Sequence, residues 1–165
     1  MRNAPARIWL MAVASLALCA PLSAQEDRLA EDLARYQHET DPVRKARDLA
    51  KFGEVQIDAA KKQLKAGDDV GSLHTLEQYR DEVGETITAL KGLGVDAEKK
   101  PAGFKELQIS LRGTMRRVDD MIFTLEVDKR PFFRAVRNDL QMEQNDLFDL
   151  LFPRRPDKNP AKQDP

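Results

Sequence analysis

Apolar residues recur at alternating intervals of three and four along most of this chain, a spacing typical of amphipathic helices. From Pro42 to about Ala66 the repeat runs through Val43, Ala46, Ala50, Gly53, Ile57, Ala60 and Leu64. An α-helix takes about 3.6 residues per turn, so residues spaced in this way form one continuous stripe along it. No segment alternates apolar and polar residues over a useful length. The spacing therefore predicts an all-α fold.

Three further long helices are predicted by the same spacing. Their expected buried faces are Leu73, Leu76, Tyr79, Val83, Ile87 and Leu90; Phe104, Leu107, Leu111, Thr114, Val118, Met121 and Leu125; and Phe133, Val136, Leu140, Leu147 and Leu151. The small residues Ala50 and Gly53 interrupt the first stripe, so we expect a partner helix to approach closely there. Charged residues form 33% of the chain and aromatic residues 6%, which suits long solvated helices.

Turn and cap residues divide these helices into pairs. Thr40 or Asp41 is expected to cap the start of the first helix, with Pro42 in its first turn. Gly67 suits the left-handed conformation that ends this helix, and Asp128 is expected to cap the last helix. Short connections favour antiparallel hairpins at residues 42–93 and 104–151, joined by a glycine- and proline-containing linker at 94–103. Residues 42–152 are thus predicted to be a four-helix bundle-like domain. A short amphipathic helix and cap precede it at 25–41, and the proline-rich residues 153–165 are predicted to be a disordered tail.

The first 24 residues have the pattern of a secretory signal peptide. Arg2 and Arg7 precede an apolar run at residues 8–18, Pro21 breaks it, and Ala24 offers a small residue for cleavage. The run is shorter than the roughly 20 residues that span a membrane, and no later segment comes close. We therefore expect export to a periplasm or to the exterior, with no membrane anchor in the mature chain.

Cys19 raises the alternative of a lipoprotein anchor. A lipobox needs a small residue directly before its cysteine, whereas Leu18 is bulky, so lipidation is disfavoured. Removing residues 1–24 leaves a mature chain without cysteine, because Cys19 is the only one. Disulfides and cysteine-based chemistry are then excluded from the mature protein.

The stretch KKQLKAGDDVGSLHTLEQYRDEV resembles the middle of a tetratricopeptide-type helical pair. Gly67 and Asp68 take the place of its turn, Leu76 and Tyr79 resemble packing residues of its second helix, and Phe52-Gly53 resembles the LG of its first. The distance from Gly53 to Gly67 is about twice the family's, Ser72 stands near a packing alanine of the family, and no repeat recurs. A looser resemblance links the chain to uncharacterised helical domains of secreted bacterial proteins. These resemblances imply helical hairpins and export, without an activity.

Groups suited to catalysis, cofactor binding or metal binding do not form a recognisable motif. His38 and His74 are the only histidines, and His74 with Glu77 lacks the other carboxylates of a bundle metal site. Neither Ser72 nor Ser110 lies in a nucleophile turn, and no glycine-rich phosphate loop occurs. We expect a non-enzymatic protein with no catalytic residue, cofactor or metal.

Arginines and phenylalanines near the C-terminus are the candidates for binding a partner. Arg112, Arg116, Arg130, Arg134 and Arg137 could line one groove for an acidic partner segment or an anion; alternatively, they pair with Asp119, Asp120, Asp139 and Glu143 along their own helices. Phe132 and Phe133 cannot both face inward, so Phe132 is a candidate contact residue. The near-neutral charge of −1 does not favour nucleic-acid binding.

Two functions remain open on these grounds. The first is an interaction module that binds a protein segment or another copy of itself. The alternative is a periplasmic stress or chaperone-like helical protein, although the chain has only LHTLEQ where paired LTxxQ motifs are typical of such proteins.

Overall fold

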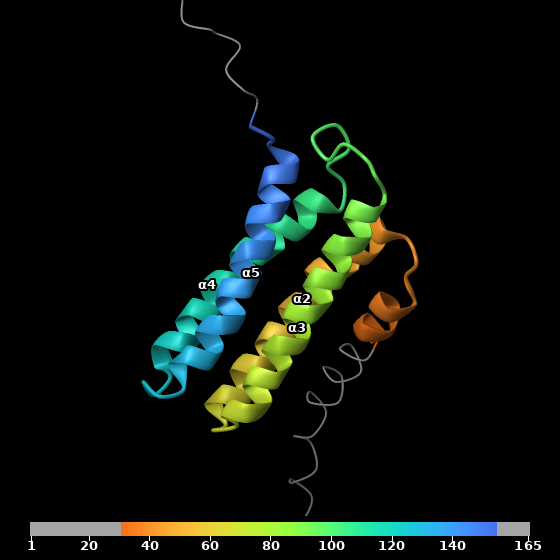
Figure 1. Ribbon diagram of the computed structural model, residues 1–165. Coiled ribbons are helices and arrows are strands. Elements are labelled where there is room, and N and C mark those ends of the chain that lie inside the picture. Colours follow the sequence, from red (N-terminus) through yellow and green to blue (C-terminus); the bar gives the residue numbers. More distant parts are fainter. Residues whose placement is uncertain (1–30, 155–165) are drawn as a thin grey trace, which may run out of the picture.

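The structure, a computed structural model, describes residues 31–154, and all secondary structure in this range is helical (Figure 1). The absence of strands among these residues confirms the predicted all-α class. The predicted signal peptide at 1–24, and residues 155–165 of the predicted tail, lie outside the described residues.

Helix α2 (Pro42–Lys65) begins and ends at local signals in the sequence. Asp41, one of the two expected caps, accepts a hydrogen bond from the Arg44 amide at 2.8 Å. Pro42 lies in the first turn, where its missing N–H leaves no bond unmade. After the helix, Gly67 has a φ of 82°, a left-handed conformation that glycine adopts without a steric penalty from Cβ.

Helix α3 (Asp69–Gly92) follows at once and forms an antiparallel hairpin with α2. The Asp68 carboxylate accepts a hydrogen bond from the Gly71 amide at 2.9 Å and so caps the first turn. Helix α4 (Phe104–Thr124) begins after the loop at residues 93–103. Its first turn is capped by Glu106, whose carboxylate accepts a hydrogen bond from the Gly103 amide at 2.8 Å.

Helix α5 (Arg130–Leu151) starts differently from the prediction. Its N-cap residue is Lys129, which makes no side-chain capping hydrogen bond, and Asp128 is exposed. A side-chain cap normally requires extended backbone at that position, whereas Lys129 has helical angles of −87° and −25°. The prediction that Asp128 caps this helix is therefore wrong, because the preceding turn already runs in a helical conformation.

The two hairpins stand side by side, and each helix of one is parallel to its counterpart in the other. Helix α2 packs on α4, and α3 packs on α5. Hydrogen bonds between the hairpins join residues at a nearly constant separation: 59 for Arg47 with Glu106, 60 for Ser110 with Ala50, and 59 for Arg80 with Asp139. Helices α2 and α4 thus form one layer and α3 and α5 a second, with both hairpin turns at the same end (Figure 1).

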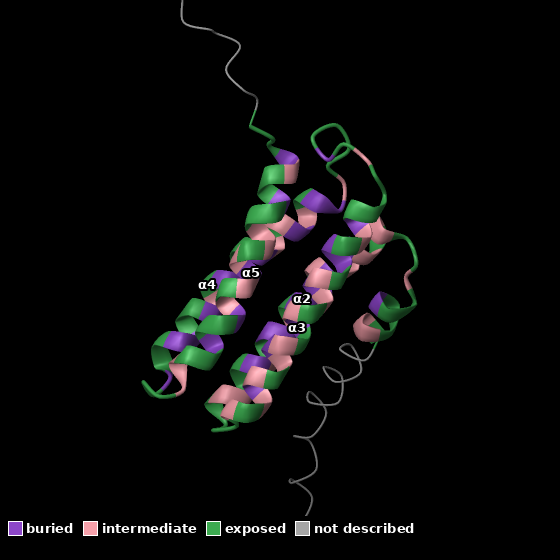
Figure 2. Cartoon of the chain, in the orientation of Figure 1, coloured by how far each residue is buried: buried purple, intermediate pink, exposed green. Residues whose placement is uncertain are grey.

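The core lies between these layers (Figure 2). Every residue expected on the inner faces of α4 and α5 is buried. A fully buried leucine or phenylalanine stabilises the fold by about 1.5–3 kcal/mol relative to an exposed one. On α2, Val43, Ala50 and Leu64 of the expected stripe are only partly buried, because they border the outer gap between α2 and α4.

The small-residue part of α2 receives a side chain. The ring of Tyr79, fully buried on α3, occupies the space that a Cβ on Gly53 would need. The Tyr79 hydroxyl lies 3.4 Å from Thr114 Oγ1, so one side chain links α2, α3 and α4. Next to it, Ser110 Oγ of α4 donates a hydrogen bond to the Ala50 carbonyl at 3.2 Å. The expected close approach is therefore made within the chain, by an aromatic ring and a serine.

A short helical segment at residues 31–38 packs on the first hairpin through Tyr36. This side chain is 3% exposed, and its ring stacks on Phe52 with centroids 5.9 Å apart. Its hydroxyl lies 3.2 Å from Thr86 Oγ1, and Lys45 Nζ lies 4.8 Å from the ring centre. Tyr36 therefore holds this segment against both α2 and α3.

Candidate functional site

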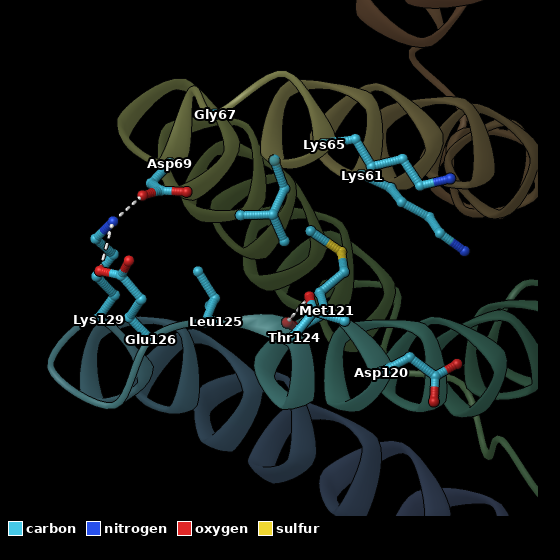
Figure 3. Close-up of a pocket in the computed structure, with 11 residues that line it drawn as sticks. Lys61, Lys65, Gly67, Asp69, Asp120, Met121, Thr124, Leu125, Glu126 and Lys129 are labelled. Carbon is cyan, nitrogen blue, oxygen red and sulfur yellow. Dashed lines mark hydrogen bonds and ion pairs between the residues drawn. The ribbon is translucent and has the colours of Figure 1, made fainter.

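The outer gap between the parallel helices α2 and α4 contains three hollows, which together we call the α2/α4 furrow. The hollow at the hairpin-turn end has a volume of about 530 Å³ (Figure 3). Its residues come from α2, from α4, from both turns and from the first residue of α3: Lys61, Leu64, Lys65, Gly67, Asp69, Asp120, Met121, Thr124, Leu125, Glu126 and Lys129. Buried Met121 and Leu125 supply apolar surface at its base, while charged side chains surround it.

Charges at the turn end are partly paired with one another. Lys129 Nζ lies 2.5 Å from a carboxylate oxygen of Asp69 and 3.2 Å from one of Glu126, which links the two hairpin turns. These partners raise the pKa of Lys129 above its ordinary value, the Asp69 carboxylate contributing most. Lys61, Lys65 and Asp120 make no ion pair with any residue in the range 31–154, so their charges are available to a ligand.

The middle and far hollows continue the furrow. The middle one, about 480 Å³, is lined by Arg47, Ala50, Lys51, Glu54, Glu106, Ile109 and Ser110. Ile109 is 58% exposed there, an unusual position for a large aliphatic side chain between two helices. The far hollow, about 510 Å³, lies against the 93–103 loop and is bordered by Val43, Leu93, Val95 and Pro101.

Two ion pairs cross the furrow between the helices. Arg47 Nε lies 3.1 Å from a carboxylate oxygen of Glu106, and Arg117 pairs with Asp58. All four side chains are at least 31% exposed, and such surface pairs contribute about 0–1 kcal/mol each. These pairs therefore align α2 with α4 but add little to the stability of the fold. They leave the hollows open.

The five predicted arginines lie on α4 and α5 in different environments: Arg112, Arg116 and Arg134 are exposed, whereas Arg130 and Arg137 are partly buried. Arg137 Nε bonds to Asp119 Oδ1 at 3.0 Å, and Arg130 donates hydrogen bonds to the carbonyls of Leu125 and Phe123. Arg112, Arg116 and Arg134 are exposed and have no hydrogen bond or ion pair among the described residues.

These contacts bear on the two interpretations of the arginines. The Arg137–Asp119 pair joins α5 to α4, and Asp139 pairs with Arg80 of α3. The expected alternative of pairs along single helices is therefore wrong for these residues, because their partners lie on neighbouring helices. Phe132 is 63% exposed whereas Phe133 is 2% exposed, so only Phe133 faces inward, as expected.

Three groups whose pKa values are raised by burial lie where the helices pack on one another. Burial raises the pKa of Tyr36 and of Tyr79 to about 12. Burial also raises the pKa of Glu82, against the effect of a 2.9 Å hydrogen bond from Gln56 Nε2. Within residues 31–154, no three metal-ligating side chains converge on one point, and His38 and His74 are both exposed.

The furrow residues were missed by sequence reasoning. Ile109, Lys61 and Lys65 each belong to an ordinary helical surface pattern, and nothing local marks them as neighbours. The one available signal is that α2 and α4 each carry a small residue, Ala50 and Ser110, where the two helices meet. This signal can be recognised only once α2 and α4 are known to lie in parallel.

Comparisons with protein-family models, with curated proteins and with solved structures find no match to this chain. In the part of the chain that the structure describes, no helix combines the length and apolar character needed to cross a membrane.

Proposed function

We propose that this chain is an exported, non-enzymatic interaction module that binds a protein segment along the α2/α4 furrow. The observation that carries this proposal is the furrow itself, where apolar surface at Ile109, Met121 and Leu125 is bordered by unpaired lysines. Concave apolar surface with a polar rim is the usual form of a segment-binding site.

The fold supports this function in a second way. Two hairpins whose helices stack in parallel at a constant separation resemble the packing of helical-repeat proteins, which present extended surfaces to partners. We accordingly propose a four-helix bundle-like domain with tetratricopeptide-like stacking. Export rests on the pattern of residues 1–24, with Arg2, Arg7 and Ala24 in the roles given above.

Photocrosslinking in the producing cells tests the furrow. We expect a photoreactive amino acid at position 109 to capture a protein, because Ile109 lies exposed between α2 and α4. The matched control carries the same group at position 99 in the 93–103 loop, where the Lys99 side chain is 80% exposed. No adduct at position 109, or equal adducts at both positions, would overturn the proposal.

The chaperone-like alternative has one structural observation in its favour. Val70, Phe123 and Val127 at the hairpin-turn end are each at least 76% exposed, which gives an apolar surface for unfolded chains. This function predicts suppression of client aggregation at equimolar amounts, with the suppression lost when Phe123 and Val127 are changed to serine. Aggregation that proceeds unchanged removes this alternative.

A further inference from the structure

The two helical layers carry opposite charge. Helices α2 and α4 together contain 11 Lys and Arg against 6 Asp and Glu, whereas α3 and α5 contain 5 against 9. The layers lie on opposite sides of the molecule, with α3 and α5 toward the viewer in Figure 1 and α2 and α4 behind them. A chain with a net charge of only −1 is therefore strongly polarised across its thickness.

Pairing within the molecule leaves this polarity in place. Basic groups of the α2/α4 layer without a hydrogen-bond or ion-pair partner among the described residues include Lys51, Lys61, Lys65, Lys105, Arg112 and Arg116. Exposed or half-buried acidic groups of the α3/α5 layer without an ion pair among the described residues include Glu77, Glu85, Glu143 and Asp149. The Arg80–Asp139 and Lys91–Asp146 bridges neutralise both basic residues of α3, so the remaining charge of that helix is acidic.

The two faces also match in size and in apolar content. Helix α2 has 24 residues, which makes a face about 36 Å long and, for two helices, about 20 Å wide. Such a face covers about 700 Å², close to the roughly 800 Å² per partner of a standard protein interface. Each face carries an exposed apolar residue, Ile109 on α4 at 58% and Met142 on α5 at 61%.

We propose that the furrow face, formed by α2 and α4, docks on the acidic face, formed by α3 and α5, of a second copy of this chain. Two furrow faces, or two acidic faces, would bring like charges together, so a two-fold dimer through either face is disfavoured. The contact is head-to-tail, and because each copy keeps one free face, it continues beyond a dimer. The inference rests on the proposed function and names the partner of the same furrow.

Sedimentation of the purified chain over a range of concentration and salt tests this contact. At low salt we expect the average mass to rise with concentration beyond that of a dimer. At about 0.5 M salt, where the screening length falls to a few ångströms, we expect a monomer. Lys51→Gln with Arg116→Gln removes two furrow charges, and Glu77→Gln with Glu85→Gln removes two acidic charges; each pair should weaken association roughly tenfold.

Mixing the two double variants gives the sharpest result. Each retains one intact face, so the mixture should form a 1:1 heterodimer that does not grow. The control Lys99→Gln with Arg154→Gln removes two positive charges from exposed positions that line none of the three hollows, and it should associate like the parent chain. Circular dichroism should show that all three variants are folded.

Other outcomes overturn the inference and separate it from the proposed function. A strict monomer at low salt, a salt-independent mass, a dimer that never grows or a mixture that stays monomeric removes the self-docking contact. The self-docking contact is also removed if the chain stays monomeric and instead sediments with anionic phospholipid vesicles, and if Lys51→Gln with Arg116→Gln abolishes that vesicle binding. In those cases the furrow adduct at position 109 in cells still decides the proposed function: an adduct of another mass keeps it, and no adduct removes it.

Discussion

The ring of Tyr79 on α3 lies directly over Gly53 on α2, where a Cβ would come within 2.4 Å of the Tyr79 Cε2 atom. Because Tyr79 is fully buried and its hydroxyl approaches Thr114 of α4, the ring cannot move aside freely. The contact sets the spacing of three helices at one point.

Gly53→Ala should destabilise the protein even though alanine favours helix. The gain in helix propensity is about 1 kcal/mol, whereas overpacking a buried site costs typically about 1–3 kcal/mol. Gly113→Ala is the matched control, since nothing lies within 4 Å of the added Cβ on α4, and it should stabilise by about 0.5–1 kcal/mol. Urea unfolding measures both, and equal shifts for the two variants would contradict the contact.

Ser72→Ala should stabilise the protein by about 0.5–1.5 kcal/mol. The Ser72 hydroxyl is fully buried and has no hydrogen-bond partner among the described residues, so its removal relieves a desolvation cost. Ser110→Ala should have the opposite sign, because that hydroxyl donates to the Ala50 carbonyl. Heat unfolding of both variants checks the prediction, which fails if Ser72→Ala is the less stable of the two.

Both tyrosines of the chain should resist ionisation in the folded state. Their pKa values of about 12 exceed the ordinary value of 10, so stability is complete below pH 10 and declines as pH rises from 10 toward 12. For fully buried Tyr79 the loss reaches about 2–3 kcal/mol. Tyrosinate absorbance should therefore appear together with the loss of helical circular dichroism. Ionisation near pH 10 without unfolding would contradict the burial.

Tyr36→Ala should release the 31–38 segment from the hairpin. The change removes the stack on Phe52 and the hydroxyl contact with Thr86, and truncation of a buried aromatic side chain here should cost roughly 2–4 kcal/mol. Limited proteolysis should then cut between residues 31 and 41 faster than in the parent chain. Phe123→Ala, at an 84% exposed position, serves as control and should change stability by less than about 0.5 kcal/mol.

Glu82→Gln should stabilise the protein at neutral pH. Burial raises the pKa of Glu82, so its ionised form is unfavourable in the folded state, and the parent chain loses stability as pH rises above the ordinary carboxylate range. The advantage of glutamine should shrink as pH falls toward 4. Chemical unfolding at pH 4 and pH 7 measures the difference. Glu77→Gln removes a carboxylate from the same helix and serves as the control for the loss of one negative charge.

Much of the local structure could be predicted because it depends on neighbours along the chain. Asp41, Pro42 and Gly67 act through their own backbone, so the limits of α2 follow from those residues. Asp128 does not cap α5 because the conformation of the preceding turn is not a local property. It depends on how α4 and α5 meet, as the hydrogen bond from Arg130 to the Leu125 carbonyl illustrates.

The sequence by itself determined that this protein is helical, which residues begin most of its helices and which faces are buried, since a period of 3.6 residues is a local property. Only the tertiary structure decided that α2 lies parallel to α4, that Tyr79 fills the space at Gly53, and that Asp119 bonds to Arg137 of another helix. The 93–103 loop has no helix or strand of its own, so the position of the second hairpin depends on the packing of the buried faces. The furrow and the opposed charges of the two layers are consequences of that selection.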